Sequence, residues 1–190
     1  LGRYLADQMS EVYSLQQHRK AFCLGNIMPD LKPSFLTTRH EFFGTFNQLQ
    51  SNMRELVERS PEEDNARVYW RRFGEVMHYM ADYFTFPHNR TYKGSLAEHN
   101  SYEAELKNRL KECILSGRAD SQLEEAKHFD SFEELVEYIR ERHTCYLESP
   151  RCIADDIRFI LRVCYQVVQG IFQLCMRRQF HMEEQPLMVG

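Results

Sequence analysis

The side chains best suited to chemistry in this chain are gathered in one short segment. His78 and Asp82 are four positions apart, and His99 and Glu103 repeat that spacing. On a helix, a spacing of four places two side chains one turn apart on the same face, where an imidazole nitrogen and a carboxylate oxygen can bind one metal ion. His88 follows a proline between the two pairs and is placed to turn toward the same region.

The residues around His78 strengthen this interpretation. Met77, Met80 and Phe84 surround the His78–Asp82 pair in the sequence, so this face of the helix should be at least partly buried. A buried imidazole and a buried carboxylate need polar partners, and a metal ion satisfies both at once. One such pair alone is more often a surface contact. Two pairs joined by a Pro-His dipeptide favour a metal site.

In order and spacing, these residues resemble the ligands of bacterial zinc-dependent phospholipases C. That family also has an aspartate and a histidine upstream, which Asp30 and His40 match in order. The resemblance covers roughly residues 1–110. It implies two zinc ions with separate ligand sets: Asp30, His40, His78 and Asp82 for the first, and His88, His99 and Glu103 for the second.

The resemblance also implies a reaction and a further ion. Zinc ions in such a centre activate a water and neutralise phosphoryl oxygens, which is the chemistry of phosphodiester hydrolysis. Asp30 is expected to be the catalytic base as well as a ligand, and the substrate is expected to be a phospholipid. The family binds a third zinc through its N-terminal amino acid and a following histidine. We expect that ion only if such ligands precede Leu1.

Three alternatives stay open. Single-strand-specific zinc nucleases are similar in fold, but their last ligand pair ends in Asp, and they need aromatic side chains to stack on a base. A ferritin-like di-iron bundle is possible because Glu75-x2-His78 and Glu125-x2-His128 match its Glu-x-x-His pattern. The third alternative is a helical protein that binds metal without catalysis.

Helical periodicity dominates the chain, and no run shows sustained strand alternation. We therefore expect an all-α fold, with one multi-helix domain over residues 1–180 and a frayed tail over 181–190. Residues 1–20 are expected to form the first helix and residues 25–33 a loop. Further helices are predicted to begin near four serines: Ser34, Ser60, Ser95 and Ser131.

The net charge and the distribution of apolar residues limit the kinds of partner that we expect. The formal net charge of −4 gives no electrostatic reason to expect nucleic acid or an anionic membrane as a partner. No stretch approaches the roughly twenty apolar residues of a membrane span, so we expect no transmembrane segment. Reaching a lipid would then require exposed aromatic side chains, for which four are candidates: Phe35, Phe84, Phe86 and Tyr92. The oligomeric state is left open.

The number and spacing of the cysteines indicate the cellular compartment in which the protein is expected. Six are scattered without CxxC spacing, so a thiolate zinc site is not expected. A helical domain of this size does not need disulfides, and we expect free thiols. Cysteine usage therefore favours the cytoplasm, whereas the resemblance to secreted enzymes favours export.

Overall fold

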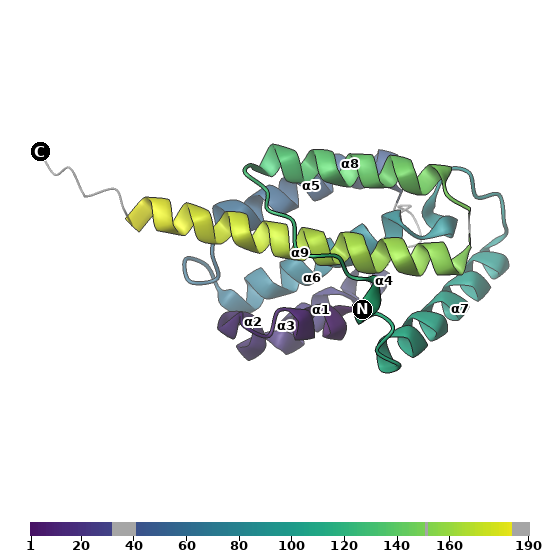
Figure 1. Ribbon diagram of the computed structural model, residues 1–190, viewed down its shortest axis with the longest axis horizontal. Coiled ribbons are helices and arrows are strands. Elements are labelled where there is room, and N and C mark those ends of the chain that lie inside the picture. The colour runs from purple at the N-terminus through teal and green to yellow at the C-terminus, as the bar shows by residue number, and fades with distance from the viewer. Residues whose placement is uncertain (32–40, 151, 184–190) are drawn as a thin grey trace, which may run out of the picture.

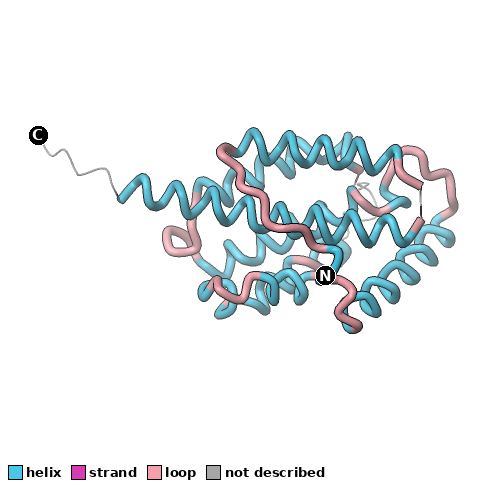
Figure 2. Tube along the Cα trace, in the orientation of Figure 1, coloured by secondary structure: helices cyan, strands magenta, loops and turns pink. Residues whose placement is uncertain are grey.

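The computed structural model describes residues 1–31, 41–150 and 152–183. Within these residues the chain forms helices and loops and no strand (Figure 2), which confirms the predicted all-α class. The α-helices are α1 (Gly2–Gln8), α2 (Tyr13–Gln17), α3 (Arg19–Gly25), α4 (Met28–Leu31), α5 (Phe42–Glu58), α6 (Ala66–Tyr83), α7 (Leu96–Leu115), α8 (Phe132–Glu148) and α9 (Ile153–Glu183). Two 3₁₀ helices, η2 (Phe86–His88) and η3 (Asp120–Gln122), lie between them.

Helix α9 runs through the middle of the molecule (Figure 1) and packs against α5, α6, α7 and α8. Its buried face is aliphatic and includes Val163, Val167 and Ile171. Among the described residues, only Ile153–His181 is long and apolar enough to cross a membrane by length and composition. Core helices pass the same test, and 61% of its most apolar stretch is buried within the fold. The expected absence of a membrane span therefore stays a prediction.

Helix α6 carries His78 and Asp82 and is buried along most of its length. Trp70 and Phe73 stack on each other with ring centroids 5.6 Å apart, and both are completely buried. Farther along the same helix, His78 is 8% exposed and Met77 and Met80 are completely buried. The apolar surroundings predicted for this histidine are confirmed.

Helices α3 and α6 approach each other closely enough for their backbones to touch. A Cβ atom on Gly25 would lie 1.9 Å from the carbonyl oxygen of Arg71, and one on Gly74 would lie 2.1 Å from that of Phe22. Only glycine fits at either position, because any side chain would overlap backbone atoms. The contact brings the end of α3 to the middle of α6, directly beside His78.

The prediction of one continuous helix over residues 1–20 is wrong, because this segment is divided into three helices. The chain there forms α1, α2 and the start of α3, with Val12 in an extended conformation between the first two. The side chain of Gln16 turns back and donates to the carbonyls of Ala6 and Met9, at 2.8 and 3.1 Å. These bonds satisfy carbonyls at the end of α1, and that favours the break.

Two other boundaries differ from the prediction. The expected loop over residues 25–33 contains the short helix α4, in which Pro29 occupies an early position that tolerates proline. Ser60 does form a capping turn with Glu63, but α6 begins only at Ala66, where Asn65 caps it. The start predicted near Ser34 lies outside the described residues, as does most of the predicted tail.

The cysteines are all free thiols, as expected.

We expect Gly74→Ala to destabilise the protein by about 1–3 kcal/mol, because the added methyl group forces two backbones apart. Gly44→Ala in α5 is the matched control, since no atom of the described residues lies within 4 Å of a Cβ atom there. That change should stabilise the fold by up to about 1 kcal/mol through helix propensity. Chemical denaturation of both variants measures the difference. Equal effects of the two substitutions would contradict the close contact.

Candidate metal centre

The first group of candidate ligands is centred on His78. Its Nε2 atom lies 3.2 Å from Oδ1 of Asp30 and 3.2 Å from Oδ2 of Asp82. Its Nδ1 atom lies 3.0 Å from the backbone carbonyl oxygen of Asn26. A carbonyl can only accept, so Nδ1 carries the hydrogen and Nε2 faces the two carboxylates. This orientation is the usual one for a metal-binding histidine held by a second partner.

Each of these side chains is positioned by a different local feature. His78 and Asp82 lie one turn apart on α6, as their spacing predicts. Asp30 lies in α4, whose short turn after the α3–α6 contact directs it to the same imidazole. Asn26 lies next to Gly25, and its amide also donates to the carbonyl of Gly74 at 3.2 Å. Sequence reasoning missed Asn26 because its contribution is a backbone oxygen. His40, the fourth predicted member of this group, lies outside the described residues.

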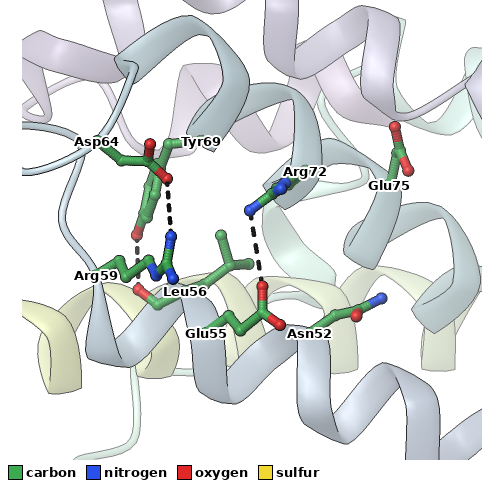
Figure 3. Close-up of a pocket in the computed structure, with 8 residues that line it drawn as sticks. All are labelled: Asn52, Glu55, Leu56, Arg59, Asp64, Tyr69, Arg72 and Glu75. Carbon is green, nitrogen blue, oxygen red and sulfur yellow. Dashed lines mark hydrogen bonds and ion pairs between the residues drawn. The ribbon is translucent and has the colours of Figure 1, made fainter.

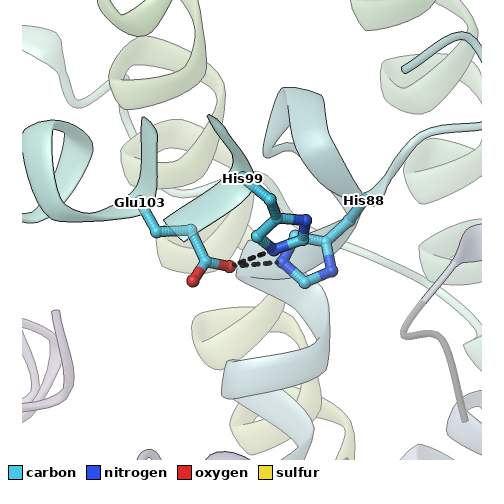
Figure 4. Close-up of side chains that lie close together, drawn as sticks. All are labelled: His88, His99 and Glu103. Atoms are coloured by element: carbon cyan, nitrogen blue, oxygen red, sulfur yellow. Dashed lines mark hydrogen bonds and ion pairs between the residues drawn. The ribbon is translucent and has the colours of Figure 1, made fainter. Parts of the chain in front are cut away.

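The second group unites His88, His99 and Glu103 (Figure 4). Oε1 of Glu103 lies 2.8 Å from Nε2 of His88 and 2.9 Å from Nε2 of His99. One potential ligand atom from each side chain lies within 4.8 Å of the others, the spacing expected of groups that share one ion. The structure therefore brings these three predicted residues together.

Local sequence explains how the second group forms. His99 and Glu103 lie one turn apart at the start of α7, which opens with a capping box between Ser95 and Glu98. His88 ends η2, a single turn that contains the buried Pro87. Its imidazole is 8% exposed, whereas that of His99 is 19% exposed. The group is thus open to solvent on the α7 side.

The two groups interact electrostatically. Burial alone would lower the pKa of His88, but the carboxylates of Asp82 and Glu103 outweigh it and raise that pKa. Burial alone would raise the pKa of Glu103, but hydrogen bonds from His88 and His99 lower it. Because the Asp82 carboxylate and the His78 imidazole both act on the pKa of His88, the two groups lie close enough to interact electrostatically.

The donor atoms suit zinc. Zinc prefers imidazole nitrogen, carboxylate oxygen and thiolate, and a set of two histidines and one glutamate is typical of catalytic sites that keep a position open. The second group supplies that set. The first supplies one imidazole and two carboxylates. Among the described residues, no cysteine belongs to either group.

An all-helical fold with two adjacent groups of imidazole and carboxylate donors defines a class of helical metalloproteins. Comparison with known families makes the assignment specific. The model of the zinc dependent phospholipase C family matches residues 1–153, and the chain belongs to this family. No curated protein and no solved structure matches the chain in the corresponding comparisons. The predicted family resemblance is therefore confirmed, over a longer stretch than residues 1–110.

The structure weakens the ferritin-like alternative. Glu125 and His128 lie in an irregular segment, residues 123–129, so their Glu-x-x-His spacing does not align them on a helix face. His128 instead contacts Asp130 and Arg177, each at 3.3 Å. The ferritin-like bundle therefore lacks its second ligand pair.

The aromatic candidates for base or lipid binding are mostly occupied by packing. Phe84 is completely buried, which corrects the expectation that it is exposed to a ligand. Phe86 packs edge-on against Tyr92 with ring centroids 5.3 Å apart. Phe35 lies outside the described residues.

A pocket of about 340 Å³ lies away from both groups, between the second half of α5 and the first half of α6 (Figure 3). None of the predicted ligands that lie within the described residues lines it. Arg72 lies 3.7 Å from Glu55, and Arg59 lies 3.8 Å from Asp64, so its charges compensate one another. We therefore place the functional centre at the histidine and carboxylate groups and not at this pocket.

Zinc binding should release protons near pH 7. Burial alone would lower the pKa of His78, but Asp82 and Asp30 outweigh it and raise that pKa to about 10. In the metal-free protein, protonated His78 thus stabilises the fold fully below its unfolded pKa of about 6.5, and this contribution is lost as the pH rises through about 10. A metal ligand must be neutral, so zinc has to displace this proton.

We therefore expect at least one proton to leave for each zinc ion bound at His78, and the apparent zinc affinity to rise about tenfold per pH unit for each proton displaced. Calorimetric titration of metal-free protein in buffers of different ionisation enthalpy measures the proton count. A binding enthalpy independent of the buffer would contradict the proposed state of His78.

Proposed function

We propose that this protein is a zinc-dependent phosphodiester hydrolase that cleaves a phospholipid on the diacylglycerol side of the phosphate. The observation that carries the proposal is the convergence of three imidazoles and three carboxylates in two adjacent groups on a protein of the zinc-dependent phospholipase C family. Asp30, His78 and Asp82, with His40, would hold one zinc ion. His88, His99 and Glu103 would hold the second.

The residues of the centre have different proposed roles in the reaction. When bound, zinc supplies Lewis acidity toward a phosphoryl oxygen and lowers the pKa of a water. Asp30 is the candidate general base, because its side chain is 56% exposed while one of its oxygens contacts His78. That exposure leaves its other oxygen open to a water molecule. Asp82 is 15% exposed at the side chain and serves as a fixed ligand.

Apolar side chains next to Asp30 favour a lipid over a nucleic acid as the substrate. Leu24, Ile27 and Leu31 are 42%, 53% and 70% exposed, and their spacing places them along the same end of α3 and α4 as the candidate base. Exposed aliphatic side chains grouped beside a site are characteristic of contact with an apolar partner. They replace the aromatic residues expected for this role from the sequence.

The test is hydrolysis of phosphatidylcholine vesicles and of single-stranded DNA by the same zinc-loaded preparation. We expect diacylglycerol and phosphocholine from the lipid and no cleavage of the DNA. Asp30→Asn should lower kcat by roughly 10²- to 10⁴-fold, the usual contribution of a general base. Mass spectrometry of the lipid products separates this reaction from the one that yields phosphatidic acid.

A second variant controls for the apolar surface. Replacing Leu24 and Ile27 together by serine should reduce turnover of vesicles while leaving turnover of a monomeric short-chain lipid unchanged. DNA cleavage without lipid cleavage would replace the phospholipase proposal with the nuclease. Bound zinc without either activity would favour the non-catalytic metal-binding protein.

A further inference from the structure

A buried carboxylate on α9 bonds to both of the elements that carry the second metal-ligand group. Asp156 is completely buried in the first turn of α9. Its Oδ2 atom accepts hydrogen bonds from the backbone N–H of Phe86, at 3.0 Å, and from the hydroxyl of Tyr102, at 2.8 Å. Its Oδ1 atom accepts from the hydroxyl of Tyr146 on α8, at 2.7 Å.

The two partners of Oδ2 stand next to ligands. Phe86 begins η2, the single turn that ends at His88. Tyr102 directly precedes Glu103 in α7. One oxygen atom of Asp156 therefore links the backbone of the turn that presents His88 to the helix that presents His99 and Glu103.

Helix α7 is least packed at its ligand-bearing end. Leu106, 7% exposed, is its one buried residue among twenty, and the side chains packed partly buried against the core begin at Tyr102 and continue with Leu110, Cys113 and Ile114. Residues 96–101 are exposed apart from His99, which is partly buried. The hydrogen bond of 2.8 Å from Tyr102 to Asp156 therefore ties this end of the helix to the body of the protein.

The other side of His88 is also held by buried polar groups. The side-chain amide of Asn89 donates to the carbonyl of Thr85 at 2.9 Å, which closes the turn around η2. Its oxygen lies 3.3 Å from Nε2 of His143 on α8. The turn is thus closed locally. Asp156 joins it to α7, alongside the contact between the Phe86 and Tyr102 rings, whose centroids lie 6.0 Å apart.

A buried carboxylate is costly unless it is fully hydrogen-bonded. Three donors satisfy Asp156, and two of them belong to the ligand-bearing elements. We propose that Asp156 is a positioning residue for the second metal-ligand group: through Oδ2 it holds η2 and α7 at the separation that lets His88, His99 and Glu103 share one zinc ion. The inference rests on the proposed zinc site. It concerns a residue beyond 1–153, the stretch that the family model matches.

Two tyrosine variants separate positioning from stability. Tyr102→Phe and Tyr146→Phe each remove one hydroxyl donor from the same carboxylate, with nearly equal bond lengths. Only Tyr102 lies on a ligand-bearing element. Zinc affinity of the full chain is measured by competition with a chromophoric chelator, and His99→Ala identifies the binding step that belongs to the second group.

We expect Tyr102→Phe to weaken that step roughly 10- to 100-fold, as loss of a partner behind a ligand usually does. Tyr146→Phe should leave it within about twofold, although we expect thermal unfolding to show a loss of stability for both variants, since each removes one hydrogen bond to a buried carboxylate. Asp156→Asn should keep most of the affinity, because its amide oxygen can still accept from Phe86 and Tyr102 while its NH₂ group faces Tyr146.

Equal zinc affinities for Tyr102→Phe and wild type, or equal losses for the two tyrosine variants, would overturn the positioning role while leaving the proposed function intact. A wild-type protein that binds no zinc at His88, His99 and Glu103 would overturn both. Asp156→Ala serves as a further check where it folds: it should lose at least as much affinity as Tyr102→Phe.

Discussion

The approach of α3 to α6 is the constraint on which the first half of the metal centre depends. Gly25 and Gly74 let the two backbones touch, and this places the carbonyl of Asn26 on Nδ1 of His78. With that nitrogen occupied, Nε2 must face Asp30 and Asp82. A side chain at either glycine would separate the helices and leave the buried imidazole without its backbone acceptor, a loss that a site buried in apolar surroundings tolerates poorly.

The second half of the centre is built differently. Its ligands come from a one-turn helix and from the exposed first turns of α7. Helix α9 supports both elements. It forms the middle of the apolar core, and its Asp156 accepts hydrogen bonds from η2 and from α7. The chain after residue 110 showed only helical character in the sequence, yet it supplies the support for residues 86–103.

The sequence predicted the parts of the site that are local. A spacing of four on a helix identified His78 with Asp82 and His99 with Glu103, and the Pro-His dipeptide identified His88. It did not identify Asp156, Asn26 or the glycine contact, because these act between residues far apart in the chain, up to 70 positions for the bond from Phe86 to Asp156. The break after α1 was missed for a related reason, since a side chain of α2 reaches back to satisfy the carbonyls of α1. Such contacts leave no periodic pattern in the residues.

Metal content of the tag-free protein, purified with zinc supplied and measured by plasma mass spectrometry, tests the central claim most directly. We expect at least two zinc ions in the wild type and the loss of about one in each of Asp82→Asn and Glu103→Gln. His128→Ala should retain them all, because that exposed histidine contacts only Asp130 and Arg177 in the described part of the chain. Wild-type protein without zinc, or zinc content unchanged in both ligand variants, would contradict the account.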